Sequence, residues 1–320
     1  MKTILSLMVV CLVAQTSIAQ TLVVAYVPNW IDLKSFSREI DYDRLTHINI
    51  AFENPTSPTG EMSYRRDNDL LVAAAHQRGV KVLVSIGGGA ASGNEPLKAR
   101  YFELLADEKR AEFCQRLADY VDEHHLDGID VDLEGPAINE DYGKFITELA
   151  AQLKPRGKFL TAALSQGYGG ASVPDECWRN FDFINVMAYD YTGPWAPDSP
   201  GQHSSLVHAK RQIEYWRTKR NVPAEKLVLG VPFYGRGFGK DFSHTAETYE
   251  RIVAKHPGAE KKDEVGETIW YNGIPTIQKK TQYVLDEELR GVMIWSLNND
   301  AKGEKSLLKA IDDTIQADRS

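Results

Sequence analysis

Residues 127–134 carry an alternation of acidic and aliphatic side chains that could perform acid–base chemistry. Asp130, Asp132 and Glu134 are separated by single aliphatic residues, and this period of two is typical of a β-strand. The three carboxyl groups therefore share one face, with neighbours about 6.6–7 Å apart along the strand. Crowded like charges raise the pKa of at least one member, and carboxyl groups with separated pKa values can act as acid and as stabiliser. The segment therefore predicts a catalytic site.

Three other interpretations of polar and glycine-rich segments are weaker. The acids resemble the first half of an EF-hand calcium loop ending at Asp141, but apolar residues lie between them and Pro136 interrupts the loop. Residues 87–89 almost form a dinucleotide fingerprint, but Ser92 stands where the third glycine belongs, so a tight turn is the better interpretation. The histidines lack the spacing of a helical metal site, and no serine or cysteine nucleophile motif is present. We expect no metal and no cofactor.

Elements that would position the acids follow from the hydrophobic pattern. Helical stretches are predicted near 69–78, 113–121, 141–154 and 305–316. Eight short runs rich in Val and Ile alternate with such stretches and read as buried parallel strands, at 22–27, 46–52, 80–85, 128–133, 159–164, 183–187, 227–231 and 291–295. This alternation predicts an α/β fold, a (β/α)8 TIM barrel, with an open doubly wound sheet as the alternative. Active sites of such barrels lie at the carboxyl ends of the strands, and we expect Glu134 to be the last residue of the fourth strand.

The first 19 residues have the pattern of a secretory signal peptide. Lys2 precedes an apolar run at 4–13, and Ser17-Ile18-Ala19 forms a small-residue cleavage site. Cleavage there would leave residues 20–320 as one catalytic domain, secreted or periplasmic, whereas an uncleaved anchor is the alternative. No later stretch is long and apolar enough to span a membrane.

Charge and cysteine content narrow the possible partners. The formal net charge is −8 with a pI near 5.6, and no block of Lys or Arg suits a phosphate backbone, so nucleic acid is not an expected partner. Cys114 and Cys177 do not form a disulfide framework, and sequence leaves open whether they pair or are buried thiols. We expect a monomer.

Aromatic residues near the ends of predicted strands form a second pattern. They come from five different runs: Tyr26, Phe52, Tyr189, Tyr234 and Trp295. In a barrel these side chains would converge at one mouth beside the acid row. Aromatic rings stack on the flat C–H faces of sugars, so the pattern favours a carbohydrate pocket.

At this point the chain resembles glycoside hydrolase family 18, the chitinase-like enzymes. The signature Asp-x-x-Asp-x-Asp-x-Glu is matched by Asp127, Asp130, Asp132 and Glu134. Further motifs occur in the family's order, namely Ser85-Ile86-Gly87-Gly88, Met187-Ala188-Tyr189-Asp190, 230–236 and 291–295. The resemblance covers residues 22–315 and implies cleavage of an oligo- or polysaccharide that contains N-acetylglucosamine, such as chitin.

The resemblance also implies a retaining mechanism in which the substrate supplies the nucleophile, an exception among retaining glycosidases. Its 2-acetamido oxygen would attack the anomeric carbon to form an oxazolinium ion. Glu134 would be the general acid and then the base, Asp132 would face the acetamido N–H, and Asp130 would share a proton with Asp132. Tyr26 and Ser85 would hydrogen-bond Asp130.

The remaining site residues are also carried over by motif. Tyr189 would donate to the acetamido oxygen, Met187 and Asp190 would line the same subsite, and Trp295 would form its floor. Phe52, Tyr234 and Arg236 fall where the family lines its pocket. The same chemistry leaves an alternative substrate, the chitobiose core of N-glycans cut by an endo-β-N-acetylglucosaminidase. A lectin-like protein without turnover is the second alternative.

Two departures from the family pattern concern the shape of the groove. Gly135 follows the predicted acid where an aromatic residue is common. Residues 239–290 are too few to hold more than a minimal version of the family's inserted α+β domain beside the helix that must also fit there. We therefore expect a shallower groove with fewer aromatic stacking platforms on the product side.

Overall fold

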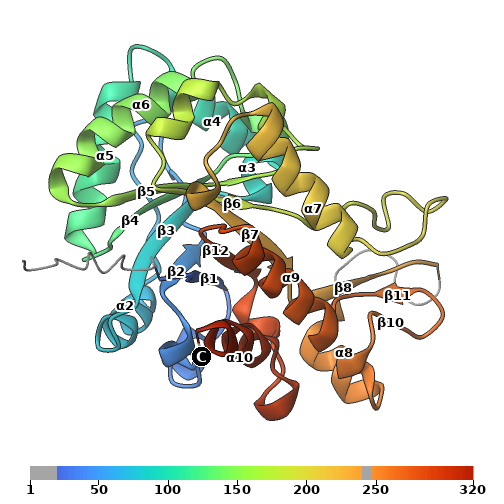
Figure 1. Cartoon of the computed structure of the whole chain (residues 1–320). Coiled ribbons are helices and arrows are strands. Elements are labelled where there is room, and N and C mark those ends of the chain that lie inside the picture. Colours follow the sequence, from blue (N-terminus) through green and yellow to red (C-terminus); the bar gives the residue numbers. More distant parts are fainter. Residues whose placement is uncertain (1–19, 240–246, 320) are drawn as a thin grey trace, which may run out of the picture.

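The computed structural model describes residues 20–239 and 247–319, and its centre is a closed barrel of eight parallel strands (Figure 1). The strands occur in the order β1-β12-β7-β6-β5-β4-β3-β2. The first and last strands pair, Leu22 beside Gly291, so the predicted (β/α)8 barrel is confirmed and the open sheet is wrong. Their bounds are β1 (Leu22–Pro28), β2 (His47–Ala51), β3 (Lys81–Gly87), β4 (Gly128–Asp132), β5 (Phe159–Leu164), β6 (Phe183–Val186), β7 (Leu227–Pro232) and β12 (Gly291–Trp295). The predicted signal peptide, residues 1–19, lies outside the described residues.

Helices surround the barrel because each buries one apolar face against the outside of the strands. Helix α6, for example, buries Phe145, Ile146 and Leu149. Ser306 caps the last helix by accepting the backbone N–H of Lys309. The helix bounds are α1 (Leu33–Phe36), α2 (Asn68–His76), α3 (Gly89–Gly93), α4 (Glu95–Leu105), α5 (Arg110–Glu123), α6 (Tyr142–Leu153), α7 (Leu206–Glu214), α8 (Tyr249–Lys255), α9 (Ile274–Asp286) and α10 (Leu307–Asp318).

A small insertion follows β7 and lies to one side of the barrel, beside α9 (Figure 1). Its four short strands are antiparallel, in the order β10-β11-β8-β9, and α8 lies in the same insertion. The strands are β8 (Tyr234–Gly237), β9 (Glu247–Thr248), β10 (Glu264–Val265) and β11 (Ile269–Trp270). The insertion is minimal, as predicted, yet it carries Tyr234 and Arg236 on β8.

Strand register brings polar residues together inside the barrel. Asp130 on β4 lies directly between Ser85 on β3 and Thr161 on β5. Strand β4 itself ends at Asp132, so Glu134 is not its last residue as predicted. Glu134 continues in extended conformation two residues beyond the strand, where it can reach the barrel mouth.

Among the described residues, no helix has the length and apolar character needed to cross a membrane.

Candidate active site

Asp130 is the fully buried inner member of the acid row and accepts four hydrogen bonds. Tyr26 and Ser85 donate to its Oδ2 at 2.6 and 2.8 Å, and Thr161 and Asn185 donate to its Oδ1 at 2.6 and 3.2 Å. Burial raises the pKa of Asp130 and the four donors oppose that rise, leaving the pKa above its ordinary value. The predicted contacts of Tyr26 and Ser85 are therefore present.

Asp132 lies one step toward the barrel mouth and has the opposite environment. It is buried, and its Oδ1 has no hydrogen-bond partner among the described residues. Burial raises the pKa of Asp132 well above its ordinary value, and the charges of Glu134 and Asp130 raise it further. Asp130 has four donors that oppose the rise of its pKa, whereas none acts on Asp132 Oδ1 among the described residues, so the proton of the pair is favoured on Asp132.

Glu134 completes the row at the wall of a cavity. Its backbone carbonyl accepts a hydrogen bond from Ser92 Oγ at 2.7 Å, which fixes the chain just beyond β4. Burial, and then the charge of Asp190, raise the pKa of Glu134 to about 7. A carboxyl group with this pKa is still about half protonated near neutral pH and can donate its proton to a leaving oxygen.

Asp190 is held as an anion by a cluster from the loop after β6 and from β8. Arg236 donates from Nε and Nη2 to the two carboxylate oxygens at 2.9 and 2.7 Å, and Tyr234 donates its hydroxyl at 2.8 Å. The His203 ring, which is fully buried, lies 3.3 Å from the same carboxylate. Burial would raise the pKa of Asp190, but His203 and Arg236 lower it well below its usual range. Asp190 therefore carries the fixed charge that acts on Glu134.

Tyr189 precedes Asp190 and lines the cavity together with Met187. Burial raises the pKa of the Tyr189 phenol, and neighbouring carboxylates, Asp132 first, raise it further. The hydroxyl thus stays protonated. In this structure it points to Met293 Sδ at 4.0 Å, a weak acceptor, so the proton is available for a better one.

Stacked aromatic rings form a floor at the barrel mouth. Trp295 lies over Tyr26 and stacks on Phe52 with a centroid separation of 5.7 Å, and Phe52 stacks in turn on the exposed Trp30 at 6.4 Å. A glycine is required at 88, because a Cβ there would lie 2.6 Å from the Phe52 ring and the backbone φ is +69°. The floor therefore depends on the turn after β3.

A cavity of about 850 Å³ has Glu134 in its wall. Its walls include the predicted residues Met187, Tyr189 and Asp190 and the exposed aromatics Tyr168, Tyr191 and Trp195. A hollow of this size with aromatic walls and convergent polar groups suits several sugar units.

The family described as glycosyl hydrolases family 18 matches residues 22–300. The chain belongs to this family. It is therefore a chitinase-like glycoside hydrolase.

Three similar proteins illustrate the likeness. The crystal structure of chitinase ChiB from the chitin utilization locus of Flavobacterium johnsoniae is 38% identical, with a TM-score of 0.86 over 93% of this chain and 95% of that one. Class V chitinase CHIT5 of Lotus japonicus is 29% identical over 86% of this chain and 82% of its own length. Probable chitinase 10 of Drosophila melanogaster is 26% identical over 87% of this chain, which spans only 15% of that protein.

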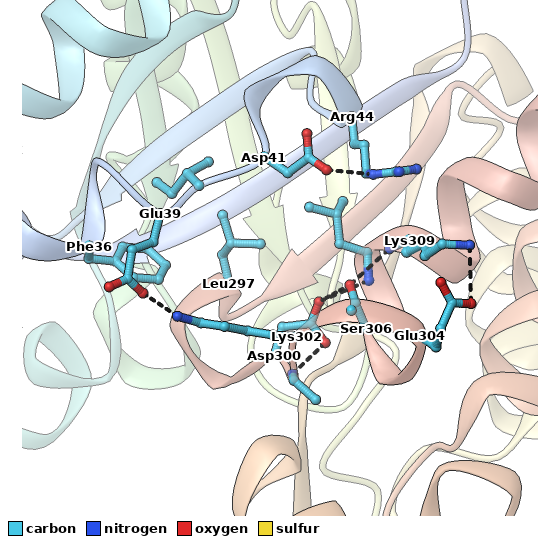
Figure 2. Close-up of a pocket in the computed structure, with 14 residues that line it drawn as sticks. Phe36, Glu39, Asp41, Arg44, Leu297, Asp300, Lys302, Glu304, Ser306 and Lys309 are labelled. Carbon is cyan, nitrogen blue, oxygen red and sulfur yellow. Dashed lines mark hydrogen bonds and ion pairs between the residues drawn. The ribbon is translucent and has the colours of Figure 1, made fainter.

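A second hollow, of about 420 Å³, lies away from the family 18 acids between the 36–44 segment and the start of α10 (Figure 2). Its charged residues are paired with one another, including Glu39 with Lys302 and Asp41 with Arg44. The half-buried Asp300 accepts from Ser306 Oγ at 2.7 Å and from backbone N–H groups at the start of α10. These polar groups have partners within the protein, whereas Asp132 Oδ1 in the acid row has none among the described residues, so the acid row is the better candidate for the reaction site.

Several residues around the family 18 site were not predicted from sequence. Thr161 and Asn185 interrupt apolar strands with polar side chains, and that interruption is a usable signal. His203, Tyr168 and Trp195 come from loops and carried no such signal. In the part of the chain that the structure describes, no group of three His, Cys, Asp or Glu side chains is arranged to hold a metal ion.

Proposed function

We propose that this protein hydrolyses β-1,4-linked N-acetylglucosamine chains, chitin or chito-oligosaccharides, by retaining, substrate-assisted catalysis. The observation that carries the proposal is the split within the acid row. Glu134 lies at a cavity wall and has a pKa of about 7, while Asp132 is buried beside it and its Oδ1 has no hydrogen-bond partner among the described residues. An acid is thus present. Asp190, the other carboxylate in this cavity wall, is held by Arg236 and Tyr234, so the acetamido group of the substrate can act as the nucleophile in its place.

The reaction begins with Glu134 donating its proton to the leaving oxygen as the acetamido oxygen bonds to the anomeric carbon. The positive charge of the oxazolinium ring faces Asp132, which passes its proton toward Asp130 and becomes the counter-charge. Tyr189 donates its hydroxyl to the acetamido oxygen and Trp295 supports the sugar ring from below. The Glu134 carboxylate then accepts a proton from water while the water oxygen bonds to the anomeric carbon and the C1–O bond of the oxazolinium ring breaks. Two successive displacements at this carbon retain its configuration.

The substrate part of the proposal is supported by the relatives. Chitinase ChiB of Flavobacterium johnsoniae is named as a chitinase, and it matches almost the whole length of both chains. Export of this chain through the signal peptide at 1–19 is part of the proposal, and N-terminal sequencing of the exported protein should begin at Gln20. Size-exclusion chromatography should give a monomer.

The first experiment measures fluorophore release from a di-N-acetylchitobioside conjugate by the wild type and by Glu134→Gln. The variant should keep its fold and lose activity by about 10²–10⁴-fold, since only the transferable proton is removed. A high-mannose glycoprotein is treated in parallel. Release of its glycans without cleavage of the conjugate would replace chitin with the N-glycan core as substrate. Tight oligosaccharide binding without any turnover would instead indicate a lectin-like protein.

A further inference from the structure

Gly135, the residue after the proposed acid, is covered by the ring of Tyr168 from the loop after β5. A Cβ placed on Gly135 would lie 2.3 Å from Tyr168 Cζ, and the backbone there has φ +50°. No real Cβ contact is this short, so a side chain at 135 and the Tyr168 ring in this position exclude each other. The aromatic ring beside the acid is thus supplied by a different loop.

Close backbone contacts hold this ring in place. The N–H of Gly135 donates to the carbonyl of Tyr168 at 3.2 Å, and a Cβ on Gly169 would lie 2.5 Å from the Gly135 nitrogen. Arg220 donates to the carbonyl of Gly170 at 2.8 Å and secures the far side of the loop. The loop is therefore docked, and the Tyr168 ring is presented by a fixed backbone.

The exposed face of Tyr168 lines the 850 Å³ cavity with Glu134, and the ring is 48% exposed. Gln212, which lines the same cavity, has a buried Oε1 without a partner among the described residues. An apolar face and an unused acceptor together suit a sugar, which offers a C–H face and a hydroxyl or amide donor.

The position of this cavity decides which sugar it takes. The stacked floor of Trp295, Phe52 and Trp30 carries the sugar whose anomeric carbon reacts, and none of these three residues lines the cavity. Met187, Tyr189 and Asp190 also line the cavity, so it begins beside the acetamido group of that sugar. It continues to Tyr168, which covers Gly135, the residue that follows Glu134 on the side away from Asp132. Glu134 protonates the oxygen that joins the two sugars, so the part of the cavity at Tyr168 lies on the leaving-group side.

We propose that Tyr168 is the stacking platform for the leaving-group sugar, a β-1,4-linked N-acetylglucosamine unit, with Gln212 accepting a hydrogen bond from it. This inference rests on the proposed function. The same platform receives an acceptor sugar after the leaving group departs, so Tyr168 also sets how the oxazolinium intermediate divides between water and sugar.

The test uses chitobiose oxazoline as donor and chitotriose as acceptor, because this donor has no leaving group. In the transfer step the ring C1–O bond of the oxazoline breaks and a C1–O4 bond to the acceptor forms. The acceptor hydroxyl proton passes to the Glu134 carboxylate, while the acetamido nitrogen gains a proton from the Asp132 and Asp130 pair. Mass spectrometry gives the ratio of transfer product to hydrolysed donor.

Tyr168→Ala should lower the transfer-to-hydrolysis ratio by about tenfold, the scale of one lost stacking contact, while total donor consumption persists. Tyr168→Phe keeps the ring and should keep the ratio. Trp30→Ala removes an equally exposed ring on the donor side and should change donor consumption but not the ratio.

An unchanged ratio in Tyr168→Ala, with the wild type active, would overturn the platform while leaving the proposed function intact. A ratio lowered equally in Trp30→Ala would also overturn it, because the effect would not be specific to one side of Glu134. A wild type that consumes no oxazoline would overturn the proposed function, and this inference with it.

Discussion

Replacing Asp190 by Asn should move the basic limb of the pH–activity profile to lower pH. Glu134 must be protonated to act as an acid, so activity is lost as pH rises through its pKa. The charge of Asp190 is the second cause, after burial, that raises this pKa to about 7. Asn has nearly the same shape as Asp and tolerates the left-handed backbone at position 190, where φ is +58°. The substitution therefore removes the charge and keeps the backbone conformation.

The size of the effect follows from the two causes. A rise from the ordinary value of 4.5 to about 7 corresponds to about 3 kcal/mol favouring the neutral acid. Burial is the larger contribution and remains in the variant, so the basic limb should move to a midpoint between 4.5 and about 7. In the wild type, about one tenth of molecules keep the proton one pH unit above the midpoint, and kcat/KM should fall about tenfold there.

The assay is kcat/KM on a soluble chito-oligosaccharide across the acid and neutral range, because this parameter reports the free enzyme. Arg236 loses its charged partner in the variant, so the absolute rate falls as well, and the midpoint of the limb is the decisive reading. Asp119→Asn removes the same charge from the exposed surface of α5 and should leave the midpoint unchanged. A basic limb that stays near 7 in Asp190→Asn, or that moves upward, would refute this account of the Glu134 pKa.

Three further predictions concern a buried lysine, the arginine that binds Asp190, and the two cysteines. Lys280 is fully buried and donates to Ser204 and Asn272, so Lys280→Met should lose about 1–3 kcal/mol of unfolding free energy in denaturant titrations, and equal stability would contradict this. Arg236→Lys cannot keep the two-pronged contact with the site carboxylate, so kcat/KM should fall about tenfold or more, and retention of full activity would argue against the contact. Cys114 and Cys177 are buried free thiols, so a thiol reagent should label neither in the native protein and both after denaturation, whereas early labelling would show them exposed.

The local sequence pattern determined the eight strands, their alternation with helices in a barrel, and the row of acids on one strand. The alternation at 127–134 fixes which side chains share a face, because the β period is a property of the backbone itself. Nearly continuous apolar runs required burial on both faces, and only a barrel or doubly wound sheet provides it. The minimal insertion followed from the length of chain between the last two strands of the barrel.

The environment of each acid was decided by tertiary structure. Asp130 meets Thr161 and Asn185, 31 and 55 residues away, only because closure of the barrel sets the register of β4, β5 and β6. Glu134 owes part of its raised pKa to Asp190, which the loop after β6 delivers. The Tyr168 ring occupies the space of a side chain at 135 only because Gly135 and Gly169 let the loops after β4 and β5 lie in close contact. Sequence spacing tells which side chains of one strand point to the same face. The pKa values of the acids and the positions of the aromatic rings depend instead on distances between strands and loops, and those are fixed only when the barrel closes.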